Sequence, residues 1–154
     1  MRTLIAYFSR SGNTKKLVDG IKEKLDCDVA RIERAVPYSD DYHTCAYVEA
    51  KKEAREKVFP EIAPINANFN EYDRILLFFP IWWYTYPMPV ATFARLIQNF
   101  NGEVLVFANS YTNDPMYMAN SMRDLKCVAP RVKFSQGLFN KSLREHINYL
   151  IKGE

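Results

Sequence analysis

The amino-acid sequence predicts a three-layer α/β fold, doubly wound, in which helices cover both faces of a parallel sheet. Short apolar runs rich in β-favouring residues alternate along the chain with segments whose apolar residues follow helical spacing. This alternation is typical of parallel sheets, because consecutive parallel strands need a crossover that is usually a helix and almost always right-handed. The 154 residues suit one core, and we expect a single domain over residues 1–154.

Five apolar runs predict the strands. Segments 2–8, 73–79 and 102–109 are short and almost wholly apolar, as expected for strands that are buried on both faces. Segment 27–34 alternates more loosely, and residues 131–134 predict a last, short strand. The carboxyl ends of these strands therefore mark where the loops of a functional site would gather.

The segments between these runs predict helices. A first helix is expected from Thr14, and a second over the charged residues 45–58. Pro89 suits the first turn of a third helix, and Asp114 suits the N-cap of a fourth because a proline follows it. Asn140 is expected to cap the last helix.

The charge pattern argues against a nucleic-acid partner. The net charge is only +3, and much of the basic charge lies among acidic residues in the segment 49–57. Opposite charges stand four residues apart at Lys52–Glu56 and Glu53–Lys57, which predicts a solvent-exposed helix face with weak ion pairs. No basic stripe alternates with stacking aromatics, so nucleic-acid binding is not expected.

Cysteine usage and hydropathy indicate a cytoplasmic protein. Three cysteines without a C-x-x-C pair predict neither a disulfide framework nor a zinc site. The N-terminus lacks a secretory signal, and the longest apolar run, 75–83, is too short to span a membrane. His43 lies two residues before Cys45, but this segment is expected to lie away from the strand ends, so a reactive thiolate is not predicted.

The loop after the first strand indicates an anion site. Ligands of open α/β sheets bind beyond the carboxyl ends of the strands. The sequence "SRSGNTKK" places Arg10, Lys15 and Lys16 at a helix start, where the helix dipole disfavours cations unless an anion is bound. Gly12 permits a positive φ, so that backbone N–H groups can converge on an oxygen cluster. An ordinary capped helix with solvated lysines is the alternative.

The form of this loop narrows the class of anion. It contains neither G-x-G-x-x-G nor G-x-x-x-x-G-K-[ST], so a dinucleotide or nucleoside triphosphate is not expected. A different phosphate-bearing ligand is the better interpretation.

The loops after two later strands have a different character. In "PIWWYTYPMP", four large aromatics follow a strand end within five residues, which indicates a flat apolar ligand, a partner subunit or the filling of a core. The prolines on either side stiffen this loop. The third loop, "NSYTND", is polar, and a simple turn before the Asp114 helix also accounts for it.

Taken together, these loops resemble the flavodoxin-like family. The motif "FSRSGNT" after the first strand and "PIWWYTYPMPVATF" after a later strand are similar to that family in content and order, and "PYSDDY" resembles a segment of one subgroup. The resemblance covers essentially the whole chain. It implies a five-stranded parallel sheet in the order 2-1-3-4-5, with FMN as cofactor at the switch point. By this resemblance, FMN contacts Ser9, Arg10, Ser11, Gly12, Asn13, Thr14, Pro80, Ile81, Trp82, Trp83, Tyr84, Asn109, Ser110, Tyr111, Thr112 and Asn113.

Two functions follow as hypotheses. The first is an FMN-containing redox protein, either an electron carrier for a partner protein or an NAD(P)H-dependent reductase of a quinone or similar small acceptor. The second is a non-redox interaction module, with a homodimer through the aromatic loop as one form. Phe78, Tyr84 and the glycine-free third loop favour the second, because many relatives carry glycine at these places. Neither hypothesis requires a metal or a catalytic side chain.

Overall fold

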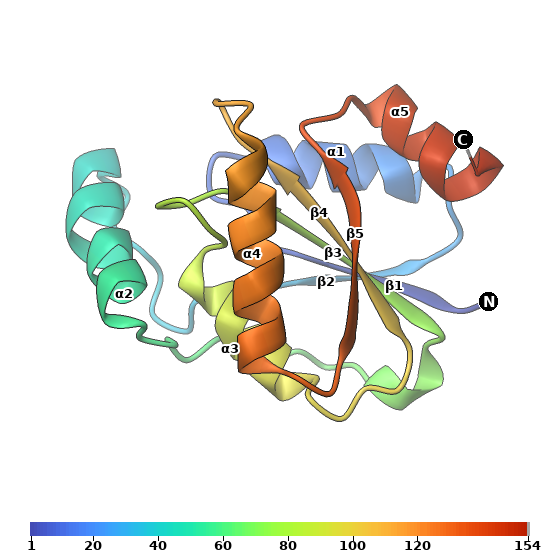
Figure 1. Cartoon of the computed structure of the whole chain (residues 1–154), viewed down its shortest axis with the longest axis horizontal. Coiled ribbons are helices and arrows are strands. Elements are labelled where there is room, and N and C mark those ends of the chain that lie inside the picture. The colour runs from blue at the N-terminus through green and yellow to red at the C-terminus, as the bar shows by residue number, and fades with distance from the viewer. Residues whose placement is uncertain (154) are drawn as a thin grey trace.

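A five-stranded parallel sheet in the order β2-β1-β3-β4-β5 forms the centre of the computed structural model, which describes residues 1–153 (Figure 1). This is the predicted architecture. The strands are β1 Thr3–Tyr7, β2 Asp28–Arg31, β3 Arg74–Pro80, β4 Glu103–Asn109 and β5 Lys133–Phe139. The order reverses between β1 and β3, so the loops that follow these two strands meet at one edge of the sheet.

Helices cover both faces of the sheet (Figure 1). One face carries α1 (Asn13–Lys22), α5 (Leu143–Ile147) and η3 (Asn148–Lys152). The other face carries α3 (Met88–Leu96) and α4 (Pro115–Val128). The short η2 (Phe69–Glu71) precedes β3. The longest of these helices, α4, has 14 residues, and across residues 1–153 no helix is long and apolar enough to cross a membrane.

A helical arm stands apart from the two layers of helices (Figure 1). It begins with the π-helix η1 (Thr44–Ala50) and continues directly into α2 (Lys51–Glu56). The expectation that Glu53 faces solvent is wrong. Its side chain turns inward, the residue is only 8% exposed, and it forms an ion pair of 3.6 Å with Arg34. The charge spacing within the helix could not predict this, because Arg34, the partner of Glu53, lies outside the helix.

The apolar strands divide their side chains between two cores. Successive residues of a strand point to opposite faces, so Leu77 and Phe79 of β3 pack under α3 and α4. Leu76 and Phe78 pack on the other side, with α1. Phe78 stacks on Phe107 of β4, with ring centroids 4.5 Å apart.

Two helix starts show how caps set the boundaries. Asp114 caps α4 as predicted, because its side chain accepts a hydrogen bond of 2.9 Å from the Met116 backbone N–H. The predicted cap of the last helix is wrong. Ser142 caps α5 through a capping box with Glu145, whereas Asn140 has a φ of 55° and lies before the helix. Strand β5 also runs beyond its predicted end at residue 134, to Phe139.

Candidate functional site

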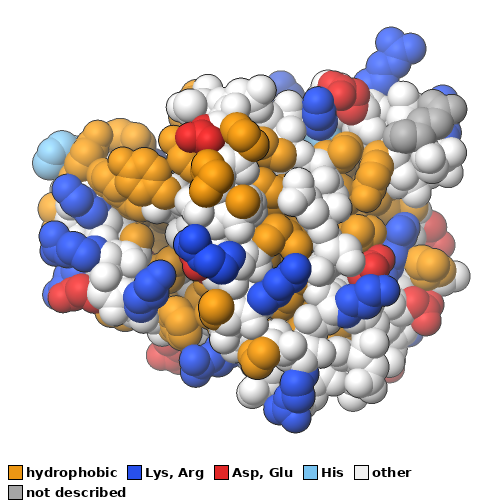
Figure 2. All heavy atoms as spheres, in the orientation of Figure 1, with side chains coloured by type: hydrophobic (Ala, Val, Ile, Leu, Met, Phe, Trp, Pro, Cys, Tyr) orange, Lys and Arg blue, Asp and Glu red, His pale blue; other side chains and the backbone are white. Residues whose placement is uncertain are grey.

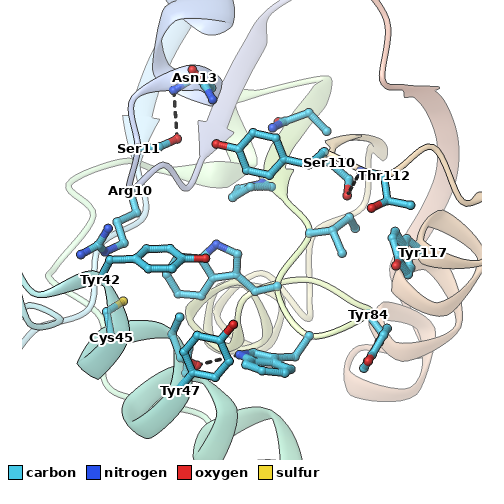
Figure 3. A pocket seen from close by; sticks show the side chains of 18 residues that line it. Arg10, Ser11, Asn13, Tyr42, Cys45, Tyr47, Tyr84, Ser110, Thr112 and Tyr117 are labelled. Atoms are coloured by element: carbon cyan, nitrogen blue, oxygen red, sulfur yellow. Dashed lines mark hydrogen bonds between the residues drawn. The ribbon is translucent and has the colours of Figure 1, made fainter.

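A cavity of about 690 Å³ lies where the loops after β1, β3 and β4 meet (Figure 3). This volume falls within the usual range of small-molecule sites. Most of the predicted site residues line it: Arg10, Ser11, Asn13, Pro80, Ile81, Trp82, Trp83, Tyr84, Asn109, Ser110, Tyr111 and Thr112. Ser9, Gly12, Thr14 and Asn113 are in the same loops but do not form its wall. The structure thus brings together three loops that the sequence separates.

The loop after β1 is organised by its own side chains. Ser9 is buried, and its hydroxyl accepts hydrogen bonds from the backbone N–H groups of Gly12 (3.2 Å) and Lys15 (3.3 Å). Gly12 has a φ of 98°, a conformation that favours glycine, and it precedes the first turn of α1. Thr14 is 1% exposed. Ser9 and Thr14 therefore support the loop from behind, while Ser11 and Asn13 face the cavity (Figure 3).

The sequence pattern indicated that Arg10, Lys15 and Lys16 gather around an anion, but of the three only Arg10 lines the cavity. The Arg10 guanidinium donates hydrogen bonds of 3.1 Å to the carbonyls of Ser39 and Asp40. Lys15 instead pairs with Asp19 on the exposed face of α1, at 2.7 Å. Arg10 thus ties the loop to the segment that leads into η1, and the cavity wall gains a cation at that edge.

The aromatic loop closes through a tight turn with unusual residues. Trp82 and Thr85 exchange backbone hydrogen bonds of 2.8 and 3.4 Å across Trp83 and Tyr84. These two central residues have φ values of 53° and 73°, as in a type I′ turn, where asparagine and glycine are normally preferred. Bulky residues in this conformation cost about 1–3 kcal/mol each and persist only where surrounding contacts hold them.

Contacts from both sides of the cavity hold this turn. The Trp83 indole N–H donates a hydrogen bond of 2.8 Å to the Ala46 carbonyl in η1. On the other side, the Asn120 amide of α4 donates one of 3.0 Å to the Tyr84 carbonyl. The turn therefore joins the helical arm to α4 across the mouth of the cavity.

The four aromatics of this loop have separate roles. Tyr86 is buried in the main core and contacts Phe79, so for this residue the core interpretation is correct. Trp82 and Trp83 line the cavity and are half-buried, and Tyr84 lies 63% exposed at its rim. Only three of the four rings thus remain available to a ligand.

Two of the features that favoured the interaction-module hypothesis are Phe78 and the glycine-free third loop. Phe78 points to the face covered by α1 and does not line the cavity. The glycine-free third loop is held by a neighbouring side chain, because the Ser110 backbone N–H donates a hydrogen bond of 2.6 Å to the Asn140 side chain. A bond from another strand end thus fixes this loop without glycine.

The helical arm supplies a wall that was not predicted. The cavity is also lined by Tyr42, Cys45, Ala46, Tyr47, Ala50 and, from α4, Tyr117. The expectation that the segment around Cys45 lies away from the strand ends is therefore wrong. Figure 2 shows hydrophobic side chains gathered on the side of the molecule where the helical arm lies. Tyr42 and Tyr47 are 66% and 50% exposed. These residues were not assigned to the site from the sequence, because η1 carries no motif of its own.

The chemistry of the lining is that of a binding site for an anionic, aromatic molecule. Hydroxyl and amide groups from Ser11, Asn13, Ser110 and Thr112 lie across from the aromatic side chains (Figure 3). Among the lining residues Arg10 is the single charged side chain, and no carboxylate is present. Burial raises the pKa of the Cys45 thiol, which keeps it protonated. Within residues 1–153, no cluster of His, Cys, Asp and Glu is placed to hold a metal.

Solved structures of other proteins have a similar fold. A flavoprotein from Lactobacillus acidophilus NCFM, solved in complex with FMN, is 24% identical with a TM-score of 0.80, covering 94% of this chain and 97% of that one. The apo-form of the flavoprotein from the same organism is 29% identical with a TM-score of 0.68, covering 92% of each chain. A candidate flavoprotein from Bacteroides uniformis ATCC 8492 is 27% identical with a TM-score of 0.79, covering 98% and 97%.

Sequence families give the same result. No curated protein matches the chain. The family model described as flavodoxin, however, matches residues 2–151. With the five-stranded sheet, the order of its strands and the loops gathered at its switch point, the match leads to one conclusion: this chain belongs to the flavodoxin family.

Proposed function

We propose that this chain binds FMN in the cavity and uses it to transfer electrons to a small acceptor or a partner protein. The observation that carries the proposal is the lining itself, in which polar donors face an aromatic wall and no carboxylate is present. The phosphate of FMN needs the polar donors, and its isoalloxazine ring needs the aromatic wall. A flavoprotein of the same fold, with a TM-score of 0.80, was solved with FMN bound.

The residues present fit this cofactor. Ser11, Asn13 and the N–H groups at the start of α1 would hold the phosphate, as helix N-termini do. Trp82, Trp83 and Tyr84 would flank the ring, with the loop 109–113 on its other side. Bound FMN supplies one- and two-electron redox chemistry, and the protein's part is to bind it, orient it and exclude water.

Within this proposal, reduction by NAD(P)H is favoured over service as an acidic electron carrier. Carriers that dock electrostatically rely on a strong surface charge, whereas this chain has a net charge of +3. Its three cysteines are free, which supports a reducing compartment such as the cytoplasm.

An FMN titration tests the proposal. FMN added to flavin-free protein should quench the fluorescence of Trp82 and Trp83 with one-to-one stoichiometry. Riboflavin, which lacks the phosphate, should bind more weakly. Steady oxidation of NADH or NADPH with a quinone would identify a reductase, and a stabilised semiquinone without turnover would identify a carrier. A protein that neither quenches nor retains flavin would contradict the proposal.

The interaction-module hypothesis makes a contrasting prediction. A homodimer through the aromatic loop would have to bury Tyr84, which is 63% exposed in the single chain. Size-exclusion chromatography of the wild type and the Tyr84→Ser variant would reveal such a dimer, whose mass should depend on Tyr84.

A further inference from the structure

We propose that Tyr38 is a positioning residue that fixes the Trp82 ring in the cavity wall, and that a partly buried charged cluster next to it sets the position of Tyr38. The cluster comprises Arg34, Glu49 and Glu53. The proposal deepens the FMN site and rests on the proposed function above.

The first step is the contact between the two rings. Trp82 lines the cavity and is packed from behind by Phe8 and Tyr38, with ring centroids 5.0 and 5.4 Å away. Both contacts are edge-to-face, at interplanar angles of 86° and 69°. Phe8 directly follows β1 and is buried. Tyr38 supports Trp82 from the segment between β2 and η1.

The second step is the set of contacts that fixes Tyr38 itself. Its hydroxyl donates a hydrogen bond to the Glu53 carboxylate. The Arg34 guanidinium lies 4.3 Å from the centroid of its ring. Charged groups thus contact both its ring and its hydroxyl, and these contacts restrain the orientation of the side chain.

The third step is the closure of the charged cluster. Arg34 forms ion pairs with Glu53 at 3.6 Å and with Glu49 at 3.7 Å. The Glu49 carboxylate also accepts a hydrogen bond of 2.8 Å from the backbone N–H of Ser39, next to Tyr38. The side chains of Arg34, Glu49 and Glu53 are only 20%, 24% and 11% exposed.

Stability alone gives a poor account of this cluster. Taking charges out of water offsets much of their mutual attraction, and buried ion pairs can often be replaced by apolar groups at no loss. Burial accordingly raises the pKa of Glu53 despite Arg34 and the Tyr38 hydrogen bond. Such networks do fix one arrangement of the groups they join. Here the joined group is the ring that supports the cavity wall.

The structure provides a matched control for removing the Tyr38 hydroxyl. Tyr72 donates a hydrogen bond of 2.6 Å to the Asp28 carboxylate and lies 5.0 Å beneath the Arg2 guanidinium. It does not line the FMN cavity. Tyr72→Phe therefore removes a hydroxyl–carboxylate bond of the same kind at a place where Trp82 is not affected.

The test compares flavin-free spectra with FMN affinity. Tyr38→Phe should weaken the near-ultraviolet circular dichroism of Trp82, identified by subtracting a Trp82→Leu variant. It should also weaken FMN binding by about three- to tenfold, the range expected for one aromatic contact. Tyr72→Phe should change neither. Equal effects of the two substitutions, or none from Tyr38→Phe, would overturn the proposal.

A double-mutant cycle separates positioning from general support. If Tyr38 acts through Trp82, Tyr38→Phe should cause no further loss of FMN affinity in a Trp82→Leu background. Additive losses would overturn the proposal. Should Tyr38→Phe not fold, Glu53→Gln, which keeps an acceptor for the hydroxyl, should bind FMN better than Glu53→Leu; equal affinities would contradict it. If the wild type binds no FMN, the proposed function fails, and the flavin-free spectra alone decide the positioning.

Discussion

The Thr14 side-chain hydroxyl donates a hydrogen bond of 2.9 Å to the Oδ1 atom of Asn109, joining residues 95 positions apart. Thr14 lies in the first turn of α1 and Asn109 is the last residue of β4. The bond therefore fixes the proposed phosphate loop relative to the third loop. It also shows that two hydroxyls of one loop have different tasks, because Ser11 faces the cavity and Thr14 faces the sheet.

Removing these two hydroxyls should therefore have different effects. Ser11→Ala should weaken FMN binding by about 1.5–3 kcal/mol, the strength of a hydrogen bond to a charged group. Its effect on the free energy of unfolding should be smaller than that of Thr14→Val, because Ser11 is exposed and its hydroxyl accepts one bond of 3.4 Å from the Asn13 backbone N–H. Thr14→Val should lower the free energy of unfolding by about 1–3 kcal/mol, because the side-chain Oδ1 atom of Asn109 loses its donor. Calorimetric titration with FMN and urea unfolding measure the two quantities. Riboflavin is the control ligand, and its affinity should not respond to Ser11→Ala.

The strained turn predicts a stabilising substitution. Tyr84 has a φ of 73° and is 63% exposed, so Tyr84→Gly relieves the backbone while giving up little burial. The relief of about 1–3 kcal/mol exceeds the cost of glycine's freedom, about 0.5–1 kcal/mol. We expect a gain of about 1 kcal/mol in urea unfolding. Tyr111→Gly serves as the control, because Tyr111 is still more exposed and has no positive φ; equal gains in both variants would contradict the strain argument.

Phe78 is predicted to act on stability and not on cofactor access. Phe78→Ala removes a buried ring stacked on Phe107 and should cost about 3–5 kcal/mol of unfolding free energy. Since Phe78 does not line the cavity, the FMN affinity of the folded variant should equal that of the wild type. Urea unfolding and FMN titration on the same sample check both statements. Tighter FMN binding would show that Phe78 does narrow the site.

His146 predicts a pH dependence of stability. The residue is 2% exposed, its Nδ1 atom donates to the Ser142 carbonyl at 2.8 Å, and its Nε2 atom has no hydrogen-bond partner within residues 1–153. Its ring lies against Phe78 and Phe107. Burial lowers the pKa of His146 below its ordinary value of 6.5, although the Ser142 hydrogen bond and the Glu145 carboxylate oppose this.

Stability should fall at acidic pH because the folded protein binds the His146 proton less tightly than the unfolded chain does. The contribution of His146 to stability is complete above pH 6.5 and is lost as the pH falls through the lower pKa of the folded state. Urea unfolding of the wild type between pH 7.5 and 5 should show this decline, and His146→Phe should flatten it. The acidic groups with lowered pKa values, such as Glu103 and Glu145, act only below their ordinary pKa of 4.5. An equal decline in the variant would assign the effect to other groups.

Residues near one another in sequence account for most of the fold. The strands and helices were predictable because apolar periodicity and caps such as Asp114 are local properties. At the last helix a local signal was present but was not used. Ser142 and Glu145 have the S-x-x-E spacing of a capping box, whereas the Asn140 side chain accepts a hydrogen bond from the Ser110 backbone N–H.

The sequence did not predict to which face of the sheet each strand residue points. A strand buried on both faces is apolar at every position, so the alternation that would assign Phe78 to one face is missing from the sequence. Only the packing of helices on either side determines that Phe78 lies with Phe107, away from the cavity.

The sequence by itself determined the sheet, its helices and the three loops at its switch point, because each is specified by residues within a few positions of one another. Only the tertiary structure decided how the site is closed. Arg10 binds the carbonyls of Ser39 and Asp40, and Trp83 binds that of Ala46, across 29 to 37 positions of the chain. Every residue has a backbone carbonyl, so no pattern of residue types in the sequence could predict these contacts. Only the fold brings their partners together.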